Sequence, residues 1–502
     1  MYYKSTRNSL VKLTSKESIV KGISDDGGLF VPYSFPKYSY EDIYKLSSYS
    51  YTDKAFYILK NFLTDFDKCV LRSCIEKSYE NKKFEFDNPS PVISIKNEKN
   101  IYMLELWHGP TCAFKDIALQ FLPHILTESA FDIFNKKEAI ILVATSGDTG
   151  KAALEGFKDI ENTRIIVFYP ENGVSEIQKF QMVTQRGSNV HVCGVNGNFD
   201  DTQSAIKKIF TNDEIKKQLE KNNMFFSSAN SINLGRLIPQ IVYYFSAYCD
   251  VMNREEIMSG KKVNIAVPTG NFGNILAAFY AKEMGLPINK LICASNSNNV
   301  LYDFIKTGIY DRNRKFNKTI SPSMDILISS NLERLLYHLT GCDDKKIKCW
   351  MKNLDEFGKY EIDENTKSKI NDIFYGGYCT ENNTKKTIKK MFFDNGYLCD
   401  PHTAVAASVY NDYITATNDK NTPVIIVSTA SPYKFSRNVL SAINEKMYDD
   451  KDDFDCNNIL SKETETKIPT QIKNIDRRKI RFNDICNKDS ILEKIKEYLN
   501  IK

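Results

Sequence analysis

The sequence lacks the cysteine patterns that mark metal sites and disulfide frameworks. Its twelve cysteines are dispersed, and no two of them stand at CxxC spacing or beside histidines at the spacing of zinc ligands. Dispersed cysteines of this kind are typical of reduced thiols in a cytosol. We therefore predict neither a structural metal nor a disulfide framework.

Long apolar runs and a strong charge bias are also missing. The opening residues, MYYKSTRNSLVKLTSKESIV, contain no uninterrupted apolar core of a signal peptide, and no later run is long enough to span a bilayer. The net charge of +5 is small for 502 residues, and the basic residues are spread along the chain. We therefore expect a cytoplasmic protein with no membrane or nucleic-acid partner.

The composition is that of an ordinary globular protein, with 42% hydrophobic and 26% charged residues. At 502 residues the chain can bury a large core, and we expect two domains with appendages. The chain contains neither an internal repeat nor a long low-complexity tract.

Alternating apolar runs and helical patterns predict an α/β fold. Short apolar runs typical of buried parallel strands stand at 139–144, 164–169, 189–195 and 224–227, with a helix at 199–210. A second series has strands at 263–267, 291–295 and 423–428, and helices at 237–248 and 275–284. The lysine-rich region 343–390 predicts exposed helices, 81–100 an exposed linker, and 491–501 an amphipathic helix. Together these elements indicate two doubly wound, mostly parallel sheets.

The chemistry of the chain is most concentrated in residues 105–120, ELWHGPTCAFKDIALQ, around Lys115. A Gly109-Pro110 turn precedes a helix whose apolar face would hold Lys115 rigid at its start, with Pro123 expected to kink that helix. Burial beside Phe114 would lower the pKa of the amine and make it a nucleophile, whereas Asp116 would act in the opposite direction. The alternative is an ordinary solvated surface lysine.

Three loops that each follow a predicted strand would meet at one crevice, because ligands in open parallel sheets lie beyond the carboxyl ends of the strands. The first, 270–274, has two glycines and precedes a helix, which suits a phosphate group but also suits a simple steric turn. The second, 145–150, is rich in hydrogen-bonding side chains, although Asp148 or Thr149 could merely cap a helix. In the third, Thr429 could contact a ligand or form a local turn.

Several of these segments resemble the threonine synthases, which are pyridoxal-phosphate enzymes that convert O-phosphohomoserine to threonine. ELWHGPTCAFKDIALQFL is similar to their cofactor-lysine segment, although Trp107 and Cys112 stand where Phe and an aliphatic residue are expected. Matching segments run in the expected order from near residue 2 to about residue 437: GISDDGGLFVP, TSGDTG, SANSIN, PTGNFGN and STASPYKF. The resemblance therefore covers most of the chain.

The resemblance implies a fold type II pyridoxal-phosphate enzyme with the cofactor between its two sheet domains, and it implies roles for particular residues. By this resemblance, Lys115 is expected to be the catalytic residue and to carry the cofactor. The implied cofactor ligands are Lys115, Gly270, Asn271, Phe272, Gly273, Asn274 and Thr429. The implied substrate ligands are Thr145, Ser146, Asp148, Thr149, Asn230, Asn233 and Arg236. Arg236 could instead be a structural ion-pair partner. We assign no binding or catalytic role to Lys151, which follows the TSGDTG segment, or to His402.

The implied organisation has four parts. Residues 1–100 form an N-terminal segment that packs on the large domain, 101–233 the lysine segment and small α/β domain, 234–445 the large cofactor-binding domain, and 446–502 a C-terminal extension. We expect a monomer or weak homodimer that acts on O-phosphohomoserine. Two alternatives remain: a related phospholyase that releases 2-oxobutyrate, ammonia and phosphate, and a non-catalytic binding protein. A Rossmann dehydrogenase is disfavoured because neither glycine loop has GxGxxG spacing.

Overall fold

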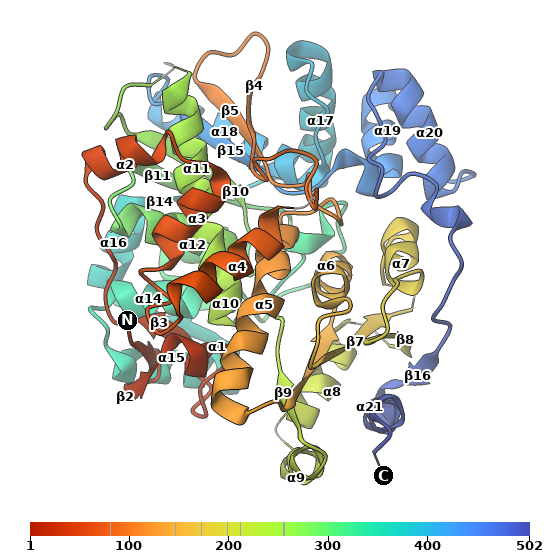
Figure 1. Ribbon diagram of the computed structural model, residues 1–502. Helices are drawn as coiled ribbons and strands as arrows, with labels where there is room; N and C mark the ends of the chain where they lie inside the picture. The colour runs from red at the N-terminus through yellow and green to blue at the C-terminus, as the bar shows by residue number, and fades with distance from the viewer. Residues whose placement is uncertain are drawn as a thin grey trace.

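The computed structural model describes residues 1–80, 82–145, 147–171, 173–197, 199–210, 212–254 and 257–501. Two mostly parallel sheets organise this part of the chain, with helices packed on both faces of each (Figure 1). The two-domain α/β expectation is therefore confirmed. Within these residues no helix has both the length and the apolar character needed to cross a membrane.

The larger sheet has six strands in the order β14-β11-β10-β15-β5-β4. They are β4 (Val92–Ser94), β5 (Ile101–Glu105), β10 (Val263–Pro268), β11 (Ile288–Ser295), β14 (Phe374–Tyr378) and β15 (Val424–Ser428). All neighbours are parallel except β4, which runs antiparallel to β5 at one edge. The surrounding helices are α11 (Pro239–Asn253), α12 (Gly273–Glu283), α13 (Val300–Thr307), α14 (Leu332–Leu339), α15 (Asp344–Phe357), α16 (Glu364–Ile373), α17 (Glu381–Asn395), α18 (Pro401–Thr417) and α19 (Ser436–Asn444).

The smaller sheet has five parallel strands in the order β16-β8-β7-β6-β9. They are β6 (Glu138–Ala144), β7 (Thr163–Pro170), β8 (Val190–Asn196), β9 (Met224–Ser227) and β16 (Ile485–Asn487). Its helices are α6 (Asp148–Phe157), α7 (Glu176–Val183), α8 (Phe199–Phe210) and α9 (Asp213–Lys221), while α5 (Lys115–Phe134) and α10 (Leu234–Leu237) connect it to the larger sheet.

Both faces of the smaller sheet are buried, which explains why its strands are apolar without alternation. In β6, Ile141 and Val143 belong to the main core that includes α5 and α6, whereas Ile140 and Leu142 belong to a separate core beneath α8. Successive side chains of a strand point to opposite faces, so a strand covered on both sides must be apolar at every position. The core beneath α8 is completed by α21 (Ile491–Leu499).

The N-terminal segment packs on the large domain. It contains a three-stranded sheet of β1 (Tyr3–Ser5), β2 (Asn8–Leu13) and β3 (Phe30–Pro32). Helix α1 (Ser15–Lys21) connects β2 to β3, and α2 (Tyr40–Leu46), α3 (Tyr51–Leu59) and α4 (Lys68–Tyr79) follow the sheet. Thr6 and Arg7 both donate hydrogen bonds to Glu333 of α14, which fixes the segment to the larger lobe.

The C-terminal extension passes from one lobe to the other. After α19 it forms α20 (Asp453–Thr464) and then runs alongside the small lobe to β16 and α21, where the chain ends (Figure 1). β16 adds a parallel strand to β8. The extension thus supplies both an edge strand and a covering helix to a sheet formed by residues far earlier in the sequence.

Three local expectations differ from the structure. The predicted linker 81–100 contains β4, and β5, which we placed with the small domain, hydrogen-bonds to β15 of the larger sheet. The lysine-rich region 343–390 contains the expected helices α15, α16 and α17, but also β13 (Lys359–Glu361), paired with β12 (Ile309–Asp311), and the sheet-edge strand β14. Pro123 lies inside α5, and the kink expected there stays a prediction.

Candidate functional site

A cavity of about 480 Å³ lies where strands of the two sheets end. Its wall includes Thr145 directly after β6, Thr269 after β10 and Thr429 after β15, together with Lys115 at the start of α5. This is the position that open parallel sheets provide for ligands. The three predicted loops therefore meet the lysine segment at one cavity.

Lys115 lies in this wall and is only 9% exposed. Its Nζ lies 3.5 Å from Asp148 Oδ2 and donates a hydrogen bond of 3.3 Å to Ser323 Oγ. Burial lowers the pKa of the amine to about 8, with Asp148 opposing the shift and Arg236 adding to it. The alternative of a solvated surface lysine is therefore excluded.

Asp116 does not act on Lys115 as the sequence suggested. Its carboxylate accepts hydrogen bonds from the N–H and hydroxyl of Thr111, and burial raises its pKa to about 6. The carboxylate that faces Lys115 is Asp148, at the first position of α6. Adjacent residues of a helix point in different directions, so neighbours in sequence need not be neighbours in the site.

Asp148 lies between two lysines. Its Oδ1 forms an ion pair of 2.5 Å with the fully buried Nζ of Lys434 and accepts a hydrogen bond of 2.9 Å from Gln178 Nε2. Although burial by itself would raise the pKa of Asp148, the ammonium groups of Lys434 and Lys115 hold it well below its usual range. Asp148 is therefore a fixed anion at the cavity wall. It does not cap α6, whose N-cap residue is Gly147 and which has no side-chain cap hydrogen bond.

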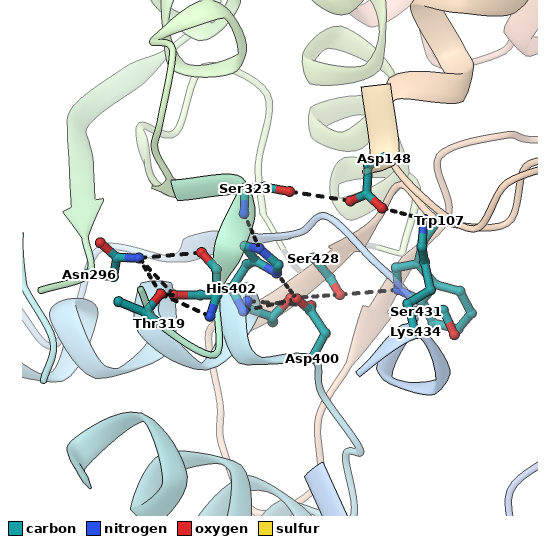
Figure 2. Close-up of polar contacts among 12 residues, drawn as sticks. Trp107, Asp148, Asn296, Thr319, Ser323, Asp400, His402, Ser428, Ser431 and Lys434 are labelled. Carbon is teal, nitrogen blue, oxygen red and sulfur yellow. Dashed lines mark hydrogen bonds and ion pairs between the residues drawn. The ribbon is translucent and has the colours of Figure 1, made fainter. Parts of the chain in front are cut away.

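A hydrogen-bonded chain leads from Lys115 through Ser323 and His402 to Asp400. Figure 2 shows the part of it that joins Asp148, Ser323, His402 and Asp400. Ser323 Oγ donates to Asp148 Oδ2 at 3.3 Å, and the Ser323 backbone N–H donates to His402 Nε2 at 3.1 Å. His402 Nδ1 lies 2.6 Å from Asp400 Oδ1. Because Nε2 accepts and Nδ1 donates, this imidazole is neutral. His402 thus holds the backbone of Ser323 in place through this hydrogen bond.

The loop 270–274 also lines the cavity and leads into α12. Phe272 has a left-handed backbone (φ 63°) and provides no side-chain cap, so the first N–H groups of α12 have no capping partner. Asn274 Oδ1 accepts from the hydroxyl groups of Tyr243 and Tyr244, whereas its buried Nδ2 has no partner within the described chain. A β-carbon at Gly270 would lie 2.6 Å from the Ser323 carbonyl oxygen. Uncapped helix N–H groups and an unpaired amide are the features that accept a phosphate ester.

Most of the remaining predicted site residues line the cavity. Thr149, Asn230, Arg236 and Thr429 line the cavity. Thr145 also lines it, but its hydroxyl accepts from the N–H groups of Gly147 and Gly150 and so shapes the loop. Ser146 lies outside the described residues.

Arg236 is a buried cation with no carboxylate partner. Its side chain is 4% exposed, Nη1 donates to the Ala229 carbonyl at 2.8 Å, and no ion pair joins it to a carboxylate of the described residues. Burial lowers its pKa to about 10. The structural ion pair considered above is therefore not found there, and the guanidinium is available to an anion in the cavity.

Asn233 does not reach the cavity, contrary to the prediction. Its Oδ1 caps α10 by accepting from the Gly235 N–H, and its Nδ2 donates to the Ile19 and Ser228 carbonyl groups. Both the oxygen and the nitrogen of the Asn233 amide are therefore bonded to groups of the protein itself. Lys151 also points elsewhere, toward Glu155 and Gln185.

Sequence reasoning missed Ser323 and Lys434 and left His402 without a role. Of the three, Lys434 stands in the STASPYKF segment named above. Ser323 contacts Lys115 and Asp148, Lys434 contacts Asp148, and His402 contacts Ser323. These partners are far apart in sequence, so residue type and spacing alone carried no signal for the contacts. No cluster of three or more potential metal-ligating His, Cys, Asp or Glu residues occurs in the part of the chain that the structure describes.

Three family models match the chain in order. Residues 2–79 match the threonine synthase N terminus, 86–366 the pyridoxal-phosphate dependent enzymes, and 403–499 the threonine synthase C-terminal region. The second of these contains both Lys115 and the loop 270–274.

Relatives in the curated proteins and solved structures agree with these models. Threonine synthase of Saccharomyces cerevisiae is 37% identical over 467 residues, with 88% of this chain and 89% of that protein covered. Human threonine synthase-like 1 is 42% identical over 86% of this chain, which spans only 58% of that longer protein. The crystal structure of threonine synthase with bound pyridoxal phosphate from Brucella melitensis has a TM-score of 0.87 and 33% identity, with 99% of each chain covered.

The matched segments, the two-sheet architecture and the shared cavity of Lys115 and the glycine loop point to one family, with the fold type II architecture that the sequence predicted. The chain belongs to the threonine synthase family of pyridoxal-phosphate-dependent enzymes.

Proposed function

We propose that this chain is a threonine synthase, which uses pyridoxal phosphate to convert O-phosphohomoserine and water into threonine and inorganic phosphate. The observation that carries the proposal is Lys115, a buried amine with a pKa lowered to about 8, in the wall of the cavity that the loop 270–274 also lines. The relatives named threonine synthase support the same activity.

The residues present suit the cofactor. Lys115 Nζ would hold the aldehyde, the loop 270–274 with the unpaired Nδ2 of Asn274 would hold the phosphate, and Thr429 would contact the pyridine nitrogen. When bound, pyridoxal phosphate supplies an electron sink for the negative charge that develops on the substrate carbons. A hydroxyl at the nitrogen, rather than a carboxylate, would leave that nitrogen largely unprotonated.

The chain's own groups then bind the substrate and move protons. Arg236 and Asn230 would hold the phosphate of the substrate, and the guanidinium would stabilise the charge of the departing group. Lys115 Nζ would remove the proton from Cα and transfer a second proton at Cβ, so that phosphate leaves from Cγ before water adds at Cβ. Asp148 and Ser323 would fix the position of Nζ during both transfers.

A phospholyase that releases 2-oxobutyrate, ammonia and phosphate is the second candidate. The relatives named threonine synthase favour the synthase over this alternative. The two reactions share the removal of phosphate and differ in the fate of the carbon skeleton. The cavity residues described above serve both.

Product analysis tests the proposal. The cofactor-loaded protein is incubated with O-phosphohomoserine, and threonine, 2-oxobutyrate, ammonia and phosphate are quantified. Equal amounts of threonine and phosphate support the synthase, whereas equal amounts of 2-oxobutyrate, ammonia and phosphate support the phospholyase. Lys115→Ala should abolish turnover and the visible absorption of the bound cofactor, and an active, yellow variant would contradict the assignment.

The assembly and cellular location also remain proposals. We infer a cytoplasmic enzyme that works as a monomer or weak homodimer on a small-molecule substrate. Light scattering across a range of protein concentrations measures the oligomeric state, and a tetramer at low concentration would contradict it.

A further inference from the structure

A second cavity, of about 310 Å³, lies outside the catalytic one. Three separate segments line it: Lys151, Glu155 and Lys158 from α6 and its end, residues 184–186 directly after α7, and Arg478 from the C-terminal extension. The extension is held at this point because the Arg481 backbone N–H donates to the Val183 carbonyl at 2.8 Å. The cavity therefore exists only where the tail meets the small lobe.

The lining of this cavity is strongly basic. It contains four cationic side chains, Lys151, Lys158, Arg186 and Arg478, and one carboxylate, Glu155. Glu155 is already shared, because its Oε2 accepts from Lys151 Nζ at 2.9 Å and from Gln185 Nε2 at 3.0 Å. The other three cations form no ion pair with a carboxylate of the described residues. The cavity thus carries more positive charge than its own protein groups neutralise.

Dispersed surface cations are usually solvated and bind nothing, and Arg186 and Arg478 are exposed. Two facts distinguish this group. The cations converge on a concave site from three chain segments, and the innermost polar groups are fixed, with Lys151 6% and Gln185 3% exposed. A buried, hydrogen-bonded polar floor below exposed basic side chains suits an anion larger than chloride.

We propose that this cavity binds a small, multiply charged phosphate compound, with Lys151 at its floor and Arg186 and Arg478 closing over it. A guanidinium presents two parallel N–H groups to a phosphate, and a lysine adds a point charge, so this set of side chains suits a phosphate group better than a carboxylate. The proposal gives the C-terminal extension a part in ligand binding as well as in packing.

The ligand would be coupled to the catalytic cavity through the two helices that border it. α6 begins with Asp148, whose carboxylate faces Lys115, and α7 carries Gln178, which donates to that same carboxylate. A ligand that draws the ends of α6 and α7 toward the tail would shift both groups that set the position of Asp148. By linkage, occupation of either cavity then changes the affinity of the other.

Calorimetry on the full-length, cofactor-loaded protein with inorganic pyrophosphate as probe tests the binding site. The test variant is Arg186→Ala with Arg478→Ala, and the control is Arg477→Ala, an exposed neighbour that does not line the cavity. We expect saturable binding to the wild type and the control, and at least about tenfold weaker binding to the double variant. Equal affinity in all three proteins would overturn the proposal, because the probe would then occupy another site. Absence of binding to the wild type would overturn it as well.

The coupling rests on the proposed function and is tested separately by the turnover of O-phosphohomoserine with and without pyrophosphate. A change in KM or kcat that the double variant loses and Arg477→Ala keeps would support coupling. If pyrophosphate binds but changes neither KM nor kcat, the proposed coupling is wrong, while the proposed anion site stands. Because calorimetry needs no turnover, failure of the proposed reaction and failure of the anion site give different results.

Discussion

At Lys115, burial together with the charges of Arg236 and Lys434 outweighs the one carboxylate that faces it, Asp148. Only the neutral amine attacks an aldehyde, and its pKa of about 8 lies well below the ordinary value of 10.5. The rate of cofactor uptake by the cofactor-free protein should therefore rise about tenfold per pH unit up to about pH 8 and level off above it. Stopped-flow absorbance measures this rate. A rise that continued to pH 10 would show an unperturbed lysine.

Asp148 and Lys434 should shift this pH profile in opposite directions. Asp148 raises the pKa of Lys115, so Asp148→Asn should move the midpoint of the uptake profile to lower pH by about one unit. Lys434 lowers it, so Lys434→Met, which keeps the length of the side chain, should move the midpoint to higher pH. Circular dichroism establishes that both variants are folded. Shifts of the same sign would refute the electrostatic account, because a packing defect does not depend on the charge removed.

At the scale of elements, the contact between α5 and α6 determines how Lys115 and Asp148 meet. A β-carbon at Gly156 of α6 would collide with the Leu119 carbonyl oxygen of α5, and backbone atoms cannot move aside as a flexible side chain can. Gly156→Ala should therefore lower the free energy of unfolding by about 3 kcal/mol and reduce activity, since it pushes α6 away from α5. Urea denaturation followed by circular dichroism measures the loss.

Gly341→Ala is the matched control for this substitution. Gly341 has a φ of +75° and no atom within 4 Å of the added β-carbon, so alanine there meets backbone strain but no neighbour. We expect a loss of about 1 kcal/mol with unchanged activity. Equal losses at the two positions would mean that the close approach of α5 and α6 is not what requires glycine.

Contacts between elements also explain why the strand β14 was not predicted from the sequence. β14 has the sequence FYGGY, whose two glycines lower its strand propensity, yet it pairs along its length with β11. Gly377 packs against Val409 of α18, which leaves little room for a side chain. The sheet edge and the covering helix make these residues a strand, and neither was visible in the local pattern.

At the scale of the whole molecule, the C-terminal extension should stabilise a sheet built from residues 138–227. Ile495 of α21 is fully buried in the core that also contains Ile140 and Phe168. Ile495→Ala should cost about 2–5 kcal/mol by leaving a cavity, and it should accelerate hydrogen exchange in β8 and β6. Glu493→Ala, at an exposed position of the same helix, should change stability by less than about 0.5 kcal/mol. Exchange that accelerated only within α21 would mean that the tail folds independently of the sheet.

The sequence by itself determined many of the local helices and strands, and it singled out Lys115 as the candidate reactive residue. Strand β9 and helix α8 have the predicted bounds, because a continuous apolar run and a helical apolar period depend only on neighbouring residues. The glycine loop after β10 and the lysine at the start of α5 were likewise evident from residue type and order.

Only the tertiary structure decided which side chains act together. It brought Asp148 rather than Asp116 to Lys115, enclosed Asn233 in the fold, and connected Ser323 to His402 and Asp400. It also placed Arg478 of the tail beside α6. The physical reason is that burial, ion pairing and pKa depend on distances between residues far apart in the chain, and a sequence contains no distances until its layers have packed.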